Sequence, residues 1–269
     1  MLRFLLIVLF VVVFLILSIP VFLAEWIIGK RNPGLRDMSS LRIVQWAFRV
    51  IIRLAGIRLT VIGEERVPKD TPVLYIGNHR SYFDIVLTYA RCPGRTGYIA
   101  KKEMEKIPLL SRWMKFLYCL FLDRKDIKQG MKTILTAIDQ IKNGISMMIF
   151  PEGTRGSAAT EAEMLPFHEG SFKIATKTGC PIVPVSIVNS SSVFEDHLPW
   201  VKAVPVIIEY GEPICPGSLS REEQKFIGRR VQEQIRETLE KNRRVLEKKA
   251  KKKTAPRIFI SATFPVICA

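Results

Sequence analysis

The sequence predicts an α/β protein, a sheet flanked by helices, preceded by an N-terminal membrane anchor helix and an interfacial amphipathic helix. The chain has 269 residues, and residues Phe4 to Ala24 form an uncharged run of 21, long enough to cross a bilayer core as a helix. Short apolar runs alternate with helical patterns further on, which is typical of strands buried between helices. The hydrophobic content of 48% excludes a disordered chain.

The first segment, residues 1–24, is expected to be an uncleaved transmembrane anchor. A cleaved signal peptide is the alternative, but a cut after Ala24 would place Phe22 where a small residue is required. Only Arg3 precedes the apolar run, and several basic residues follow it, so the positive-inside rule puts the body on the cytoplasmic side of the membrane. The basic residues that follow are Lys30, Arg31, Arg36 and Arg42.

The second segment, residues 25–57, is expected to be a basic linker and an interfacial amphipathic helix. Within residues 41–54, polar and apolar positions separate onto two faces at helical spacing. The polar positions are Arg42, Gln45, Arg49 and Arg53, and the apolar ones are Ile43, Ala47, Val50, Ile51 and Leu54. Such a helix can lie in a membrane interface with its cations towards anionic head groups; the alternative is a surface helix packed on the body.

The body, residues 58–218, is expected to hold the sheet. The predicted strands are Arg58–Ile62, Val73–Gly77, Tyr98–Ala100, Leu120–Leu122, Met147–Phe150, Ile182–Val188 and Val204–Tyr210. Apolar residues at helical spacing predict a helix between residues 127 and 141, which Asn143 and Gly144 end, and a shorter helix at residues 170–177, which Gly179 ends.

The C-terminal part is expected to be a charged helix with a polybasic end, residues 219–257, and an apolar tail, residues 258–269, of unknown role. The helix is predicted for residues 220–247, with apolar positions at Ile227, Val231, Ile235 and Leu239. The polybasic run 241–257 is either the solvated end of this helix or an anchor that binds anionic lipid through its surface potential.

The net charge of +16 lies mainly in the flanks of the chain. Residues 61–240 carry 24 basic and 22 acidic side chains, a net charge of +2, whereas residues 25–60 carry +5 and residues 241–257 carry +8. A nucleic-acid-binding domain would carry its basic patch on the folded body. The distribution therefore excludes nucleic acid and favours an anionic membrane surface as the partner.

The chain has five scattered cysteines and no CxxC pair. This spacing excludes a disulfide scaffold and argues against a structural zinc site.

The first candidate for chemistry is His79 with Asp84, which follows a predicted buried strand. Ser81 and Asp84 match the N-cap signature of a helix that begins between them, so His79 would lie in the preceding loop and could fold back on Asp84. The carboxylate would then hold one ring nitrogen while the other takes a proton. The alternative is that Asp84 only caps the helix and His79 is a surface residue.

The second candidate is the segment from Phe150 to Ser157, which also follows a predicted strand. Its glycines allow the backbone to approach a ligand closely, and Arg155 could bind a phosphate through two parallel hydrogen bonds. The alternative is a tight turn with an Arg–Glu surface pair. Arg124, at the end of another predicted strand, is a further candidate anion ligand.

Together these segments resemble the glycerolipid acyltransferase family, and within it the 1-acyl-sn-glycerol-3-phosphate (lysophosphatidic acid) acyltransferases, over residues 59–213. Residues 78–84 resemble the family's His-x4-Asp (HX4D) block, and residues 150–155 match its Phe-Pro-Glu-Gly-Thr-Arg block without a substitution. Residues 183–185 resemble its fourth block. Residues 121–124 resemble its second block, although Cys119 stands where the family commonly has Gly. His168 stands where the family often has Lys, in a segment that resembles the family between residues 167 and 170, and its role is open.

The resemblance implies an acyltransferase of phospholipid biosynthesis that moves a fatty acyl group from an acyl thioester to the sn-2 hydroxyl of 1-acylglycerol 3-phosphate, giving phosphatidic acid. The acceptor would be a membrane lipid, the donor acyl-CoA or acyl carrier protein, and no metal or cofactor would be needed. The alternatives are an acyltransferase for another lysolipid or for glycerol phosphate, an acyl-thioester hydrolase, and a non-enzymatic lipid-binding adaptor.

The resemblance also implies roles for individual residues. His79 would be the general base, and Asp84 would orient it. The residues implied to bind the acceptor's glycerol phosphate are Arg124, Glu152, Gly153, Thr154 and Arg155, with Asn78, Ser81 and Pro184 in support. A carboxylate repels phosphate, so Glu152 is expected to pair with an arginine or to bind a hydroxyl. The backbone amides of residues 78–81 are candidate donors to the oxyanion of the reaction.

Overall fold

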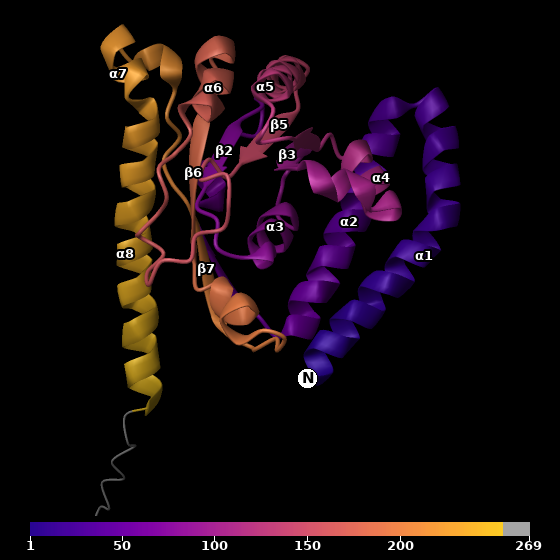
Figure 1. The fold of residues 1–269 in the computed structure, drawn as a ribbon, viewed down its shortest axis with the longest axis horizontal. Helices are drawn as coiled ribbons and strands as arrows, with labels where there is room; N and C mark the ends of the chain where they lie inside the picture. The colour runs from indigo at the N-terminus through magenta and orange to yellow at the C-terminus, as the bar shows by residue number, and fades with distance from the viewer. Residues whose placement is uncertain (255–269) are drawn as a thin grey trace, which may run out of the picture.

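The computed structural model describes residues 1–254 and consists of two long N-terminal helices followed by an α/β body (Figure 1). The helices are α1 (Leu2–Arg31), α2 (Pro33–Ala55), α3 (Tyr82–Tyr89), α4 (Pro108–Phe116), α5 (Ile127–Lys142), α6 (Lys173–Thr178), α7 (Arg221–Lys225) and α8 (Ile227–Thr254). The strands are β1 (Arg58–Ile62), β2 (Leu74–Gly77), β3 (Thr96–Lys101), β4 (Leu120–Leu122), β5 (Ser146–Ile149), β6 (Ile182–Val188) and β7 (Pro205–Tyr210). The predicted apolar tail 258–269 lies outside the described residues.

Within residues 1–254, seven strands form one sheet in the order β1-β7-β6-β2-β5-β3-β4. Neighbouring strands pair in parallel except β6 and β7, which are antiparallel. The carboxyl ends of β6, β2, β5, β3 and β4 therefore meet at one edge of the sheet. In parallel α/β sheets this edge is where ligands bind.

Helices cover both faces of the sheet because successive side chains of each strand point to opposite sides. Tyr75 packs in a cluster with α2, α3 and α4, whereas its neighbours Leu74 and Ile76 pack in a second cluster with α5, α6 and α8. The predicted α/β class, with a buried sheet flanked by helices, is confirmed.

The predicted strands are all present within two residues of their expected bounds. The predicted helix 220–247 is instead two helices, α7 and α8, and the predicted helix 170–177 is a 3₁₀ turn (Glu169–Phe172) followed by α6. Helix α4 was not predicted, although Pro108 at its first position is a common start signal.

Helix α1 is the one helix of residues 1–254 that is long and apolar enough to cross a membrane, with a mean hydropathy of 3.3. One side of it packs on the body. The ring centroids of Phe22 and Trp113 are 4.9 Å apart, and the Trp113 indole N–H donates to Ser18 Oγ at 2.8 Å. The other side exposes large apolar side chains, among them Leu2, Leu5, Leu9, Val12, Ile16, Leu17, Ile19 and Leu23. An exposed apolar surface of this extent is typical of a contact with a membrane or another protein.

Helix α2 lies beside α1 on the side of the molecule away from α8 (Figure 1). Arg42, Arg49 and Arg53 are exposed, in agreement with the amphipathic prediction. Gln45, expected on the same polar face, is instead buried, and its side-chain amide donates to the backbone carbonyls of Tyr89 and Cys92. That part of the prediction is wrong, because the end of α3 offers the hydrogen-bond partners that a buried amide requires.

Helix α8 packs on the sheet through the predicted positions. Ile227, Val231, Ile235 and Leu239 are at most 1% exposed. The basic run that begins at residue 241 is partly held by the body: Lys241 Nζ lies 2.6 Å from Glu209 Oε1, and Arg243 Nη1 lies 3.2 Å from Glu161 Oε2. Those two cations are therefore engaged within the fold.

Candidate active site

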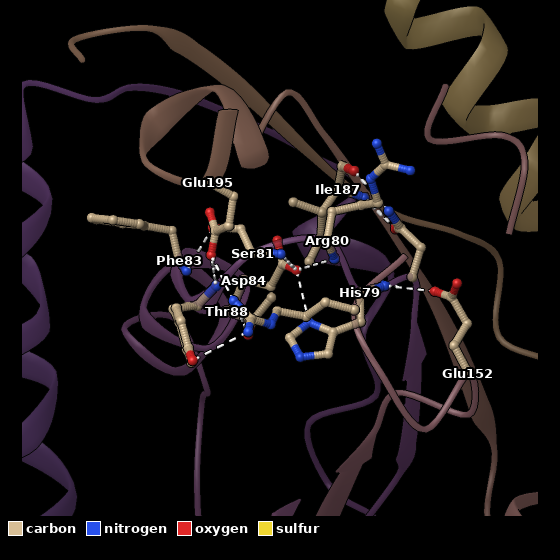
Figure 2. A network of polar contacts seen from close by, with 12 residues as sticks. His79, Arg80, Ser81, Phe83, Asp84, Thr88, Glu152, Ile187 and Glu195 are labelled. Carbon is tan, nitrogen blue, oxygen red and sulfur yellow. Dashed lines mark hydrogen bonds and ion pairs between the residues drawn. The ribbon is translucent and has the colours of Figure 1, made fainter. Parts of the chain in front are cut away.

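The predicted residues His79 and Asp84 meet at the edge where the parallel strands end. His79 follows β2, and Asp84 lies in the first turn of α3. His79 Nδ1 is 2.9 Å from Asp84 Oδ2 (Figure 2). The helix begins between them, which brings together two residues that a continuous helix would hold on different sides.

The capping of α3 places the carboxylate of Asp84. Ser81 is the N-cap, its Oγ accepts from the backbone N–H of Phe83 at 3.0 Å, and Asp84 accepts from the N–H of Ser81 at 2.8 Å. The same Asp84 oxygen accepts from the N–H of Arg80 at 2.7 Å. The predicted N-cap signature is confirmed. The carboxylate of Asp84 has 0% side-chain exposure, so a substrate cannot reach it.

The ring of His79 is oriented by stacking as well as by hydrogen bonding. It lies 4.3 Å from the ring of Phe150 at an interplanar angle of 17°. Because a carboxylate accepts from Nδ1, the neutral ring carries its proton there and presents Nε2 as the basic nitrogen. Within residues 1–254 the structure gives Nε2 no hydrogen-bond partner, and the side chain is 15% exposed.

Glu152 does not have the arginine partner that was expected for it. Its Oε1 accepts from the backbone N–H of His79 at 2.7 Å, and its Oε2 accepts from the N–H of Leu165 at 3.0 Å. Burial raises the pKa of this carboxyl above its usual value, while the two N–H groups and nearby His79 oppose that shift. The expected arginine pairing is wrong because Glu152, 4% exposed, lies beneath the loops and ties the loop after β2 to the loop after β5; the alternative, a bond to a hydroxyl, stays a prediction.

The expectation that backbone amides of residues 78–81 donate to an oxyanion is also largely wrong. The N–H of His79 donates to Glu152, and those of Arg80 and Ser81 donate to Asp84. These amides are used to build the site, so they are not free to receive the charge that develops in a reaction.

The supporting residues Asn78 and Pro184 belong to the sheet. The side chain of Asn78, 1% exposed, donates to the carbonyl of Ile187 at 2.9 Å and accepts from its N–H at 2.8 Å. This pair of bonds fixes the end of β2 against β6. Pro184 lies inside β6 opposite Ile76, and its carbonyl accepts from Gly211.

The loop after β5 carries Gly153, Thr154 and Arg155. Gly153 has a φ of +71°, which favours glycine, and a Cβ there would come within 3.2 Å of the His168 ring. His168 thus lies against the loop. Thr154 and Arg155 line a groove of about 960 Å³ together with Arg80, Asn189 and Glu195.

Arg155 and Arg124, both expected to bind one glycerol phosphate, follow different strands, β5 and β4, which lie two places apart in the sheet. Arg155 reaches towards the segment after β6, where its Nη1 donates to Glu195 at 3.2 Å. Arg124 is exposed and follows β4, three strands from β2 and so about 14 Å along the sheet edge. The Arg–Glu pair considered as an alternative for Arg155 is present, with Glu195 as the acid.

Sequence reasoning missed Glu195 and Arg80. Arg80 donates to the carbonyls of Ala158 at 2.6 Å and Thr160 at 3.2 Å, which folds the loop after β5 over the groove. Arg80 could have been found from the sequence, because it is a basic residue directly after His79. Glu195 carries no local signal, because its partners Ser81, Tyr82 and Arg155 lie 114, 113 and 40 residues earlier in the chain.

Comparisons with known proteins find acyltransferases. Residues 58–188 match the family model described as Acyltransferase. A 1-acyl-sn-glycerol-3-phosphate acyltransferase of Saccharomyces cerevisiae is 29% identical over 208 residues, which are 75% of this chain and 68% of that protein. One of Borreliella burgdorferi is 29% identical over 204 residues, 75% of this chain and 79% of that protein.

A solved structure is similar over nearly the whole chain. The crystal structure of the 1-acyl-sn-glycerophosphate (LPA) acyltransferase PlsC from Thermotoga maritima has a TM-score of 0.77 and 26% sequence identity, and the match covers 90% of this chain and 95% of that chain. Fold and site together define an O-acyltransferase with a His–Asp pair at the open edge of its sheet. Residues 58–188 are an acyltransferase-family domain, as the motifs predicted, and the chain is similar over most of its length to 1-acyl-sn-glycerol-3-phosphate acyltransferases.

Proposed function

We propose that this enzyme transfers a fatty acyl group from an acyl thioester to the sn-2 hydroxyl of 1-acylglycerol 3-phosphate, giving phosphatidic acid. The contact between His79 Nδ1 and Asp84 Oδ2 carries this proposal. The names of the relatives from Saccharomyces cerevisiae and Borreliella burgdorferi support the choice of acceptor. The donor is acyl-CoA or acyl carrier protein.

The chemistry needs a base because a hydroxyl is a poor nucleophile. His79 Nε2 takes the proton of the acceptor hydroxyl as its oxygen attacks the thioester carbonyl, and Asp84 stabilises the imidazolium that forms. The tetrahedral intermediate then collapses, the C–S bond breaks, and the proton on Nε2 passes to the departing thiolate. The acceptor attacks the thioester directly, so no acyl-enzyme forms.

We assign the acceptor's phosphate to Arg155, supported by Thr154 and Gly153. Arg155 lines the same groove as Arg80, the residue after His79, and its planar guanidinium suits a phosphate. Glu152 acts by holding the loop rather than by contacting phosphate, as its two backbone bonds indicate. Arg124, about 14 Å from β2 along the edge, would contact a different part of the substrates.

We further propose that α1 anchors the enzyme and that the catalytic domain faces the cytoplasm. The exposed apolar side of α1 supports membrane contact, and the basic residues after it support this orientation. Acceptor and product are bilayer lipids. A site held at the membrane surface avoids moving acyl chains into water, which costs about 0.8 kcal/mol per CH₂.

The deciding experiment uses purified enzyme, radiolabelled acyl-CoA or acyl carrier protein, and 1-acylglycerol 3-phosphate in vesicles. We expect labelled phosphatidic acid, and we expect His79→Ala to lower its rate by about 10²–10⁴-fold. Equal release of free fatty acid with and without acceptor would instead identify an acyl-thioester hydrolase. Full activity of His79→Ala would remove the catalytic assignment and favour a lipid-binding adaptor. A panel of lysolipids and glycerol 3-phosphate tests the other acceptors.

A further inference from the structure

We propose that Glu195 is a positioning residue that holds the phosphate-binding arginine and the His–Asp pair in one arrangement. This role rests on the proposed function, since it takes His79 as the base and Arg155 as the phosphate ligand. Glu195 begins a short 3₁₀ turn (Glu195–His197) in the segment that follows β6. Neither the family match, which ends at residue 188, nor any motif in the sequence points to it.

The carboxylate of Glu195 joins two parts of the site. Its Oε2 accepts from Ser81 Oγ at 2.6 Å, and its Oε1 accepts from the backbone N–H of Tyr82 at 2.8 Å (Figure 2). Oε1 also accepts from Arg155 Nη1 at 3.2 Å. Segments that follow β2, β5 and β6 are therefore bound to one carboxylate.

The contact with Ser81 acts on the His–Asp pair. Because the hydroxyl of Ser81 donates to Glu195, its lone pairs face the helix and accept from the N–H of Phe83. The carboxylate also lies at the amino end of α3, where negative charge is favourable. Glu195 thereby fixes the turn in which Asp84 accepts from the N–H of Ser81 and meets His79.

The contact with Arg155 acts on substrate binding. The guanidinium of Arg155 lies over the ring of Tyr82, with Cζ 3.8 Å from the ring centroid, and its Nη2 donates to the Tyr82 hydroxyl at 3.2 Å. Two of its five N–H donors have partners in these contacts, and the others can bind an anion. Holding an arginine in place before substrate arrives reduces the entropy lost on binding.

The segment that carries Glu195 is itself fixed. Phe194 stacks on Phe4 of α1, with ring centroids 5.8 Å apart and an interplanar angle of 12°. Asp196 accepts from the hydroxyls of Ser191 at 3.2 Å and Ser192 at 2.9 Å. A carboxylate on a fixed segment can impose a position on Arg155, which is 36% exposed, rather than follow it.

The test is Glu195→Gln in the full-length enzyme, with Glu233→Gln as the matched control, since Glu233 also pairs with an exposed arginine, Arg236 on α8. We expect the KM for 1-acylglycerol 3-phosphate to rise about tenfold, since a hydrogen bond to a charged group is lost, and kcat to fall by less. Glu233 contacts neither α3 nor Arg155 among the bonds of residues 1–254, so Glu233→Gln should match the wild type. An unchanged acceptor KM in a folded Glu195→Gln enzyme would overturn the proposal.

The double variant Arg155→Ala/Glu195→Gln separates positioning from general destabilisation. If Glu195 acts on the acceptor through Arg155, its effect on the acceptor KM should shrink to less than about twofold once Arg155 is absent, because residues that act as one unit are not additive. Full additivity would refute this role. If Glu195→Gln does not fold, the same cycle is run with Glu195→Asp, which keeps the charge but shortens the reach to Arg155.

Failure of this proposal is distinct from failure of the proposed function. A wild-type enzyme that makes no phosphatidic acid refutes the function. If the wild-type enzyme makes phosphatidic acid and His79→Ala is inactive, but Glu195→Gln has a normal KM and kcat, only the role of Glu195 is refuted.

Discussion

Replacing Asp84 by asparagine removes one negative charge from the site and leaves its shape nearly unchanged. The asparagine oxygen can still accept from His79 Nδ1, as the Asp84 oxygen does now at 2.9 Å, and from the N–H of Arg80 or Ser81. The neutral ring therefore keeps its orientation. What is lost is the attraction between the carboxylate and the imidazolium that forms when His79 takes a proton.

The magnitude follows from the distance between these charges. Opposite charges about 4 Å apart attract by about 4 kcal/mol at an effective dielectric constant of about 20. Asp84 has 0% side-chain exposure, so water does not screen it directly. Since about 1.4 kcal/mol corresponds to a tenfold change in rate, the upper limit is about 10³-fold, and we expect kcat to fall by about 10²- to 10³-fold. The KM for each substrate should change by less than about threefold, because a buried carboxylate cannot touch a substrate.

The assay is steady-state formation of phosphatidic acid, with thermal unfolding as the check on folding. Glu223→Gln is the matched control, since Glu223 is the carboxylate at the same position of the capping box that begins α7, far along the chain from His79. Both variants lose charge at a helix start, where negative charge is favourable, and only Asp84→Asn should lose activity. A kcat of Asp84→Asn within threefold of the wild type would show that Asp84 only caps α3.

Three further predictions concern binding, stability and the membrane. Arg155→Ala should raise the acceptor KM at least tenfold, and Arg124→Ala should raise it less, because Arg124 lies about 14 Å from β2 along the sheet edge; the reverse order in steady-state kinetics would assign the phosphate to Arg124. Burial raises the pKa of Glu152 above its ordinary 4.5, so the folded state binds the proton of this carboxyl more tightly than the unfolded chain does. The protonated carboxyl therefore stabilises the fold at low pH, and this stabilisation is lost as pH rises from about 4.5 through the raised pKa. In urea unfolding, the free energy of unfolding of the wild type minus that of Glu152→Gln should therefore fall as pH rises across this window. A difference that does not change with pH would contradict the raised pKa. The double variant Leu9→Asp/Leu17→Asp, at positions 60% and 62% exposed on α1, should release the enzyme from vesicles in sedimentation assays, since each leucine contributes about 1.5–3 kcal/mol when buried. The control Phe226→Asp, at a position 57% exposed before α8, should not release it. Equal release by both variants would mean that α1 is not the anchor.

The part of the site that was predictable from the sequence is local. His79 and Asp84 are five residues apart, and the N-cap at Ser81 decides that the helix starts between them. A cap depends on residue types at fixed spacing along one short segment. The contact between the two side chains therefore follows from the sequence without knowledge of the rest of the fold.

The parts that were predicted wrongly depend on neighbours from distant segments. Glu152 was expected to pair with an arginine or to bind a hydroxyl, but the chain folds so that two backbone N–H groups face it. The amide of His79 was a candidate oxyanion donor, but Glu152, 73 residues further along the chain, accepts from it. Whether a buried polar group finds a side chain or a backbone partner depends on which loops cover it, and no local pattern reveals that.

The sequence by itself determined the strands, the capped helix, the His–Asp pair and the apolar helix at the start of the chain. Hydrophobic periodicity and helix capping depend only on residues that lie close together in the chain. Only the tertiary structure decided that β6 lies beside β2, and hence that Glu195 contacts Ser81 and Arg155 while Arg124 lies three strands away from β2. Strand order is set by packing the whole sheet between its two layers of helices, and the partners it brings to Glu195 lie 40 residues (Arg155) and 114 residues (Ser81) away in the chain.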